Sequence, residues 1–171
     1  MTIRRPAAWA AATVLALLAG LGLYWFQPWK LVTDRQVDEA LAVVPAPAAE
    51  TSGPTIARQG TFISHEHDTR GMARVVLHPD GSRVLELLDL ATSNGPDLRV
   101  WLSDQPVRPG LDGWRVFDDG ASLELGRLKG NQGNQRYAIP PGTDLDRLAS
   151  VAIWCKRFSV SFGAATLRPE H

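Results

Sequence analysis

The feature that most constrains the fold of this chain is a run of 20 uncharged residues, from Ala7 to Phe26. An α-helix rises ~1.5 Å per residue, so a helix over this run is ~30 Å long, the thickness of a bilayer hydrocarbon core. A buried helix of a soluble domain is usually shorter than this. We therefore predict a transmembrane helix over residues 7–26, which makes the membrane a partner of the chain.

The charges on either side of this run predict its orientation. Arg4 and Arg5 precede it, whereas only Lys30 follows it closely. Because basic residues favour the cytoplasmic side, we expect residues 1–6 to be cytoplasmic and the chain beyond the helix to be extracytoplasmic. The prediction is a single-pass protein of the cell membrane.

A cleaved signal peptide is the alternative interpretation of the apolar run. Cleavage requires small residues soon after the run, but the segment Gln27-Pro28-Trp29-Lys30 follows it. A lipoprotein signal requires a cysteine at this point, and the chain has a single cysteine, Cys155. The sequence favours an uncleaved signal anchor and leaves cleavage open.

Residues 27–58 have the composition of an extracytoplasmic linker. Leu31, Val37, Leu41 and Val44 recur near one face of a helix, which predicts a short amphipathic helix within residues 30–44. The segment that follows mixes proline with small residues and cannot bury a core. We expect it to be an extended tether that holds the domain away from the lipid headgroups.

Residues 59–169 read as short β-strands separated by turn residues, with residues 170–171 as a tail. The sequence Pro79-Asp80-Gly81 predicts a hairpin, because glycine tolerates a positive φ. Candidate strands or strand parts are 74–78, 83–88, 98–103, 114–117, 123–125, 136–139, 150–155 and 158–163, with a polar loop at 131–135 and a helical turn at 144–148. We predict an all-β domain, an antiparallel β-sandwich or barrel-like fold of seven to nine short strands.

Charge and cysteine content exclude several classes of protein. The formal net charge is zero, and acidic and basic residues are mixed along the β-domain. A chain without a basic face is not expected to bind nucleic acid. With one cysteine, the chain has no internal disulfide, and the fold depends on its apolar core.

Cys155 is the first candidate for chemistry. Alternation along the strand places Val151, Ile153 and Cys155 on one face, the more apolar one, so the thiol is expected inside the core or at its rim. One reading is a structural thiol that acts as a small hydrophobe. The other is a reactive thiol whose pKa is lowered by the cations of Lys156 and Arg157.

The remaining polar residues give weaker signals. His65 and His67 would share one face of a strand, a spacing that suits a metal, but a solvent face often carries two histidines, and we predict no metal site. Blue copper also needs a histidine soon after the cysteine, which is missing here. No constellation typical of a hydrolase is present, so whether the chain is an enzyme stays open. Trp101 alternates onto the polar face of its strand and is expected to be exposed.

Three groups of motifs resemble the DM-thirteen domain family, which carries an electron-transfer label. The first comprises Gly60-x-Phe62, His67 before Gly71, and Asn94-Gly95-Pro96-Asp97-Leu98-x-Val100-x-Leu102-Ser103. The second is Leu125-Gly126-x-Leu128-Lys129-Gly130-Asn131-x-Gly133-Asn134-Gln135-x-Tyr137-x-Ile139-Pro140. The third is Ser150-Val151-x-Ile153-Trp154-Cys155-x-x-Phe158-Ser159-Val160-x-Phe162-Gly163-x-Ala165-x-Leu167.

The resemblance implies a redox role centred on the cysteine of the Trp-Cys motif, here Cys155. It would act as a bare thiol or as a ligand to a group such as haem, with His67 as a second cofactor-binding residue. The chain has no c-type haem attachment motif, so an electron partner would be a separate protein. The alternative is a non-enzymatic binding or adhesion module with a structural cysteine, which would use Trp101 or the 131–135 loop.

Overall fold

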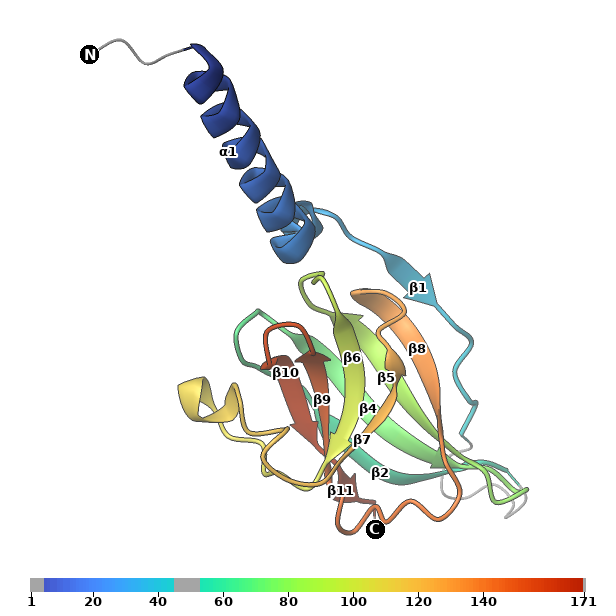
Figure 1. The fold of residues 1–171 in the computed structure, drawn as a ribbon. Coiled ribbons are helices and arrows are strands. Elements are labelled where there is room, and N and C mark those ends of the chain that lie inside the picture. The colour runs from blue at the N-terminus through green and yellow to red at the C-terminus, as the bar shows by residue number, and fades with distance from the viewer. Residues whose placement is uncertain (1–4, 45–52, 171) are drawn as a thin grey trace.

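The computed structural model describes residues 5–44 and 53–170 (Figure 1). One α-helix, α1 (Arg5–Phe26), and two 3₁₀-helices, η1 (Pro28–Val32) and η2 (Gly110–Gly113), occur in these ranges. The strands are β1 (Gln36–Asp38), β2 (Thr55–Thr61), β3 (Ile63–Ser64), β4 (Arg70–Leu77), β5 (Arg83–Ala91), β6 (Leu98–Ser103), β7 (Ser122–Arg127), β8 (Gln132–Ile139), β9 (Ser150–Cys155), β10 (Val160–Thr166) and β11 (Arg168–Pro169).

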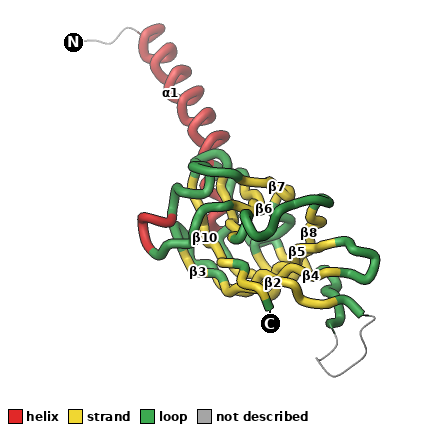
Figure 2. Tube along the Cα trace, turned by 90° about the horizontal axis from the view of Figure 1, so that it is seen from below, coloured by secondary structure: helices red, strands yellow, loops and turns green. Residues whose placement is uncertain are grey.

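The strands form two sheets that pack as a β-sandwich, one of the two predicted β architectures (Figures 1 and 2). The six-stranded sheet has the order β1-β8-β5-β4-β2-β11, and the five-stranded sheet has the order β3-β10-β9-β6-β7. The described residues thus contain more strands than the seven to nine predicted. The strands that the prediction lacks are β1, β2, β3 and β11. Of these, β1, β3 and β11 have only two or three residues each, and β2 begins within the predicted linker.

Helix α1 projects away from the sandwich and meets it only through its C-terminal end (Figure 1). Its large apolar side chains are exposed; Trp9 and Leu17, for example, are 74% and 69% exposed. From Pro6 to Phe26 the helix is long and apolar enough to cross a membrane. An anchor and a signal sequence both have this character.

The main core lies between the two sheets. Strand β9 contributes Val151, Ile153 and Cys155 to it, as alternation predicts, and the six-stranded sheet contributes residues such as Leu85 and Leu87. The predicted hairpin is also present, because β4 and β5 pair in antiparallel register around a turn in which Gly81 has a φ of 80°.

A second, smaller core covers the outer face of the five-stranded sheet. Trp154 and Phe117 are almost completely buried there, together with Ala152 and Ala164. The strand predicted at residues 114–117 is wrong: this segment belongs to a loop that crosses the outer face of the sheet. The segment is apolar because it packs on the sheet: Phe117 is buried against Trp154, with ring centroids 6.3 Å apart. This apolar composition gave the segment the sequence pattern of a strand.

The segment after α1 is not the amphipathic helix predicted within residues 30–44. It forms η1 and then β1, which pairs in parallel with β8, the one parallel pair among the described strands. A Cβ at Gly130 or Gly133 would collide with the backbone carbonyl of Arg35 or Val37, so these glycines permit the close approach. We call residues 33–44 the strap.

The strap continues over the outer face of the six-stranded sheet. The backbone N–H of Ala42 donates to Oε1 of Glu86 at 2.8 Å, and Arg74 donates to the carbonyl of Ala42 at 2.9 Å. Most of the predicted tether, residues 45–52, lies outside the described residues. Strand β2 then begins at Thr55, four residues before the predicted start of the domain.

Candidate functional site

Cys155 is the last residue of β9, where the strand reaches the end of the sandwich that meets α1 (Figure 1). It pairs with Leu98 of β6 and with Val160 of β10, so the thiol lies on a central strand. The residue is completely buried in the main core. Alternation along β9 therefore predicted the direction of the side chain correctly.

Burial raises the pKa of the Cys155 thiol above its usual value, because an apolar environment disfavours the thiolate. Backbone N–H groups of Phe158, Arg157 and Asp97 act in the opposite direction, and the carboxylate of Glu66 raises the pKa further. In this closed form the group is a neutral thiol at neutral pH.

The side chains of Lys156 and Arg157 do not activate the sulfur as the sequence suggested. The ammonium group of Lys156 lies 3.2 Å from a carboxylate oxygen of Glu124. The guanidinium group of Arg157 donates to the backbone carbonyls of Trp25 and Tyr24, at 2.7 and 3.2 Å. Because both cations are engaged elsewhere, the groups that favour negative charge on the sulfur are backbone groups, of Phe158 and Arg157 in this turn and of Asp97 in the loop before β6.

Residues 156–159 form a tight turn that closes over the end of the core, and we call them the lid. The N–H of Phe158 donates to the carbonyl of Cys155 at 3.2 Å, and the N–H of Lys156 donates to that of Asp97 at 3.0 Å. Ser159 has a φ of 48°, a left-handed conformation that is strained for a residue other than glycine. The side chain of Arg115 also donates to the carbonyls of Phe158 and Ser159, at 3.3 and 3.5 Å, so the lid is held largely by long hydrogen bonds at the surface and contains one strained residue.

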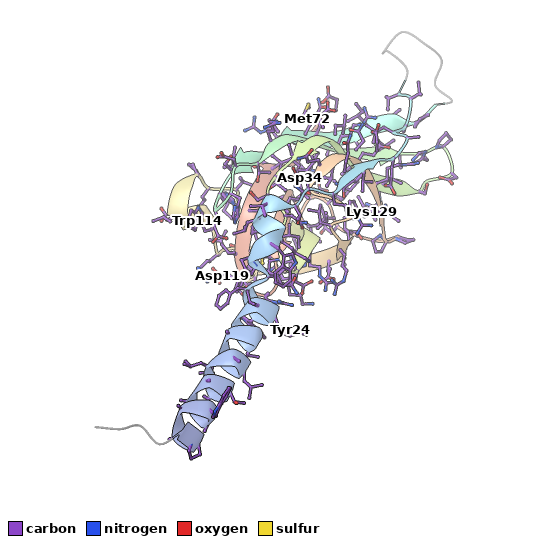
Figure 3. All side chains as sticks on the ribbon, turned by 90° about the horizontal axis from the view of Figure 1, so that it is seen from above. Tyr24, Asp34, Met72, Trp114, Asp119 and Lys129 are labelled. Carbon is purple, nitrogen blue, oxygen red and sulfur yellow. The ribbon has the colours of Figure 1, made fainter. Side chains whose placement is uncertain are left out.

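The lid contacts the end of α1. The rings of Phe158 and Phe26 stack with centroids 5.7 Å apart, and the guanidinium of Arg157 lies 5.3 Å from the ring centroid of Trp25. Figure 3, which looks down on this end, shows Tyr24 in the part of α1 next to the domain. The segment that covers Cys155 is therefore also the segment that docks onto the apolar helix.

His67 lies in a bend after β3 rather than on a strand. Its ring is 4.0 Å from that of Phe162, a residue of the same core as Cys155, and its Nε2 is 3.9 Å from a carboxylate oxygen of Glu66. Among the contacts of the described residues, none joins His67 to Cys155. Nor do the described residues contain a cluster of three or more His, Cys, Asp or Glu side chains that would hold a metal.

The site in this form does not fit an axially ligated haem. An iron ligand needs an open coordination direction, whereas the Cys155 side chain is closed in by the core and the lid. Four surface cavities of about 430 to 560 Å³ are lined by other residues, and neither Cys155 nor His67 contributes to them. Cys155 and His67 are therefore not arranged to hold a haem iron in this form.

His65 has a separate, structural environment. Its Nε2 lies 3.0 Å from the carbonyl of Arg108, so Nε2 carries the proton and Nδ1 accepts from the hydroxyl of Ser161 at 2.8 Å. Burial lowers the pKa of His65, and the hydrogen bond to Arg108 opposes this only in part. The neutral form of His65 therefore holds the loop that carries Arg108 against β10.

This gives a prediction for pH. Because the pKa of His65 is depressed in the folded state, its contribution to stability is complete above the unfolded pKa of about 6.5 and is lost as the pH falls through the folded pKa. We expect thermal melts of the chain to shift downward between pH 7.5 and pH 5. A His65→Gln variant should show a smaller shift, with His67 and His78 still present as internal controls. An equal shift in the variant would assign the pH dependence to other groups.

Residues 61–167 match the family model described as Electron transfer DM13. This chain belongs to the DM13 family. The DM13 match begins at the end of β2 and ends just before β11, so it includes Cys155, His67 and the lid but not α1 or the strap. No curated protein and no solved structure matches the chain.

The polar loop predicted at residues 131–135 is wrong, because most of this segment is a strand and the amides of Asn131 and Gln135 are buried and internally bonded. Gln135 accepts from the N–H groups of Lys129 and Gly130 and donates to the Gly130 carbonyl at 2.7 Å. Asn131 donates to the carbonyl of Thr92 at 2.8 Å. Four of the five residues lie in β8, so the amide-rich motif of the DM13 domain serves the fold.

Trp101 is only partly exposed. Its ring stacks on that of Trp154 with centroids 5.3 Å apart, and its Nε1 lies 3.4 Å from a carboxylate oxygen of Glu124. The alternation of residues along β6 correctly predicted that the Trp101 side chain points away from the main core. It did not predict that the ring stacks on Trp154. A tryptophan on each of two paired strands is the signal that would have indicated it.

Proposed function

We propose that this DM13 chain is a membrane-anchored, extracytoplasmic redox module whose working group is the thiol of Cys155. Helix α1 is the single-pass anchor, with its N-terminus in the cytoplasm. The partner is a separate protein of the same compartment that presents a disulfide. The lid opens to expose the sulfur and closes to protect it from unspecific oxidation.

The observation that carries the proposal is the position of Cys155 beneath the segment that docks onto α1. The backbone N–H groups of Arg157 and Phe158 lie at the sulfur, and the side chains of the same two residues contact Trp25 and Phe26 of α1. Movement of the domain relative to the helix therefore acts directly on access to the thiol. A sulfur placed elsewhere in the core would be indifferent to such movement.

The chemical step is thiol–disulfide exchange. When the lid opens, Cys155 loses its proton and the thiolate attacks one sulfur of the partner disulfide. A Cys155–partner disulfide forms, the partner's own disulfide bond breaks, and the leaving thiolate takes up a proton. The Cys155 sulfur is oxidised and the leaving sulfur is reduced. Because the chain has a single cysteine, the mixed disulfide is resolved by a thiol from another molecule.

His67 has a subordinate role in this proposal. It lies beside Phe162 and Glu66 at the same end of the core, and the carboxylate of Glu66 raises the thiol pKa. His67 is thus the neighbour of the carboxylate that acts on the thiol. The residue is therefore a positioning group for charge and not a ligand of the sulfur.

A second candidate function is a binding or adhesion module in which Cys155 is structural. Complete burial of the residue and the raised pKa of its thiol favour this candidate. It predicts that the sulfur reacts only when the whole domain unfolds. In the redox module the Cys155 sulfur is exposed by opening of the lid, whereas in the binding module it is exposed only by unfolding of the whole domain.

The test is the rate at which Cys155 reacts with an aromatic disulfide in the full-length chain in lipid nanodiscs. Arg157→Gln removes two hydrogen bonds and two cation–π contacts from the lid, so we expect about ten-fold faster reaction at an unchanged melting temperature. The rate should rise with pH as the thiolate fraction grows. Arg147→Gln, at an exposed arginine at the other end of the domain, should leave the rate unchanged.

Denaturant separates the two exposure events. Local opening of the lid exposes little surface, so the reaction rate of the wild-type chain should change little at low urea concentration. A rate that follows global unfolding over the whole urea range, with no effect of Arg157→Gln, would contradict the redox proposal and leave the binding module.

A further inference from the structure

A cavity of about 430 Å³ lies at the end of the sandwich that meets α1. Its walls come from three segments that are distant in sequence: the chain that follows α1, the loop before β6 and the loop between β7 and β8. Lys30, Arg35, Arg127 and Lys129 contribute the basic groups of the lining, and Asp97 contributes the acidic one. We call this cavity the basic pocket.

The walls of the basic pocket are fixed by hydrogen bonds. Asn94 donates from Nδ2 to the carbonyl of Thr33 at 3.1 Å, which joins the loop before β6 to the strap. Asn131 accepts from the N–H of Arg35 at 2.7 Å, which joins the strap to the loop before β8. The cavity is therefore a built feature of the fold.

Neighbouring carboxylates neutralise the charge of the basic pocket only in part. Asp97 is paired with Arg99 at 2.8 Å and lies 3.4 Å from Arg127, and Lys129 is held by Glu39 at 2.8 Å. Among the described residues, Lys30 and Arg35 form no salt bridge. Arg127 remains 71% exposed. The pocket thus offers three cationic groups to an anion.

The position of the pocket selects the anion. Headgroup layers extend ~5–8 Å beyond each side of the hydrocarbon core. Lys30 lies four residues after Phe26, in a 3₁₀-helix that rises ~2 Å per residue, so it is at most ~8 Å beyond the apolar helix. Trp25 and Trp29 at this point are typical of the membrane interface. The pocket is therefore at the level of lipid phosphates.

We propose that the basic pocket binds the phosphate of an anionic phospholipid in the leaflet on the domain side. Lys30, Arg35 and Arg127 supply the charge, and the strap that carries Arg35 fixes the distance of the pocket from the helix. The lipid would hold the α1 end of the domain against the membrane. This inference rests on the proposed membrane anchoring but is independent of any chemistry at Cys155.

The test is a titration of the full-length chain, in a neutral detergent, with phosphatidylglycerol, with bound lipid counted by native mass spectrometry. Each basic residue near an anionic surface changes partitioning about five-fold. We expect Arg35→Gln/Arg127→Gln to weaken retention of the first lipid by about ten-fold or more, and Lys30→Gln to weaken it about five-fold. The matched control, Arg147→Gln/Arg168→Gln, removes two exposed arginines at the opposite end and should retain the lipid.

Two outcomes would overturn the lipid site. One is equal retention of phosphatidylglycerol by the Arg35→Gln/Arg127→Gln variant and its control, both checked for folding by thermal melting. The other is equal retention of phosphatidylcholine and phosphatidylglycerol by the wild-type chain, which would indicate lipid held by α1 alone. The intact mass from the same spectra shows whether α1 is still attached. A chain that has lost α1 is thereby distinguished from a chain whose pocket does not bind the lipid. Neither result tests the reactivity of Cys155.

Discussion

Replacing Glu86 by alanine is expected to lower the free energy of unfolding by about 3–5 kcal/mol, the range for a buried charge pair that loses one partner. Glu86 is completely buried, and its carboxylate lies 2.8 Å from Arg74 and 3.3 Å from Arg136. It also accepts from the N–H of Ala42 in the strap. The substitution removes the carboxylate partner of the nearly buried Arg74 guanidinium, which keeps only its hydrogen bond to the Ala42 carbonyl, and it leaves the N–H of Ala42 without an acceptor.

Urea unfolding of the full-length chain in detergent measures this effect. Glu124→Ala is the matched control, because Glu124 also pairs with basic residues but its side chain is 30% exposed. Exposed pairs contribute at most about 1 kcal/mol. In addition, hydrogen exchange at the N–H of Ala42 should accelerate in Glu86→Ala only. A loss as small as that of the control would mean that the strap is not fixed by Glu86.

The second large effect is expected for Trp154→Ala. Trp154 is 1% exposed, stacks on Trp101 and meets the edge of Phe117. Removing a buried tryptophan takes away both its transfer free energy and its packing, which together cost about 3–5 kcal/mol. Because Phe117 belongs to the loop that crosses the sheet, that loop should also lose its fixed position.

Near-ultraviolet circular dichroism and urea unfolding together test this prediction. Trp101→Ala removes a tryptophan of the same pair that is only partly buried, so its loss should be clearly smaller. Trp154→Ala should also weaken protection of the loop amides near Phe117, whereas Trp101→Ala should not. Equal losses for the two variants would indicate that the second core does not depend on burial of Trp154.

The sequence predicted those parts of the fold that depend on local period and turn chemistry. Alternation gave β6 its boundaries and placed Cys155 on the inner face of β9. The hairpin at Gly81 followed from one glycine with a positive φ. These features are encoded within a few consecutive residues, and the two-sheet architecture follows from repeating them.

Features that depend on distant partners could not be predicted in this way. The charges of Lys156 and Arg157 were assigned to the thiol, but their partners are Glu124 and the end of α1, 32 and more than 130 residues away. The period over residues 30–44 resembles a helix, yet Gly130 and Gly133, one just before β8 and one within it, allow this segment to pair with β8 as a strand. The direction of a side chain is determined by its neighbours in the sequence, whereas its ion-pair partner can come from a distant part of the chain.

The candidate site shows the same division. The sequence and the DM13 resemblance identified Cys155, and alternation indicated its burial. The lid was not foreseen, because its covering role comes from a turn that contacts a helix more than a hundred residues earlier in the chain. The pair of histidines at 65 and 67 was placed on one strand face, but a bend directs them to different partners.

Equilibration with glutathione tests the central claim most directly. The full-length chain in nanodiscs is incubated, without denaturant, in glutathione buffers of increasing oxidised fraction, and its intact mass is recorded alongside that of Cys155→Ser. We expect one glutathionyl group to appear on the wild-type chain in proportion to the oxidised fraction, to be removed again by reduced glutathione, and to be absent from the variant. A wild-type mass that stays unmodified in every buffer until urea unfolds the domain would contradict a redox role for Cys155.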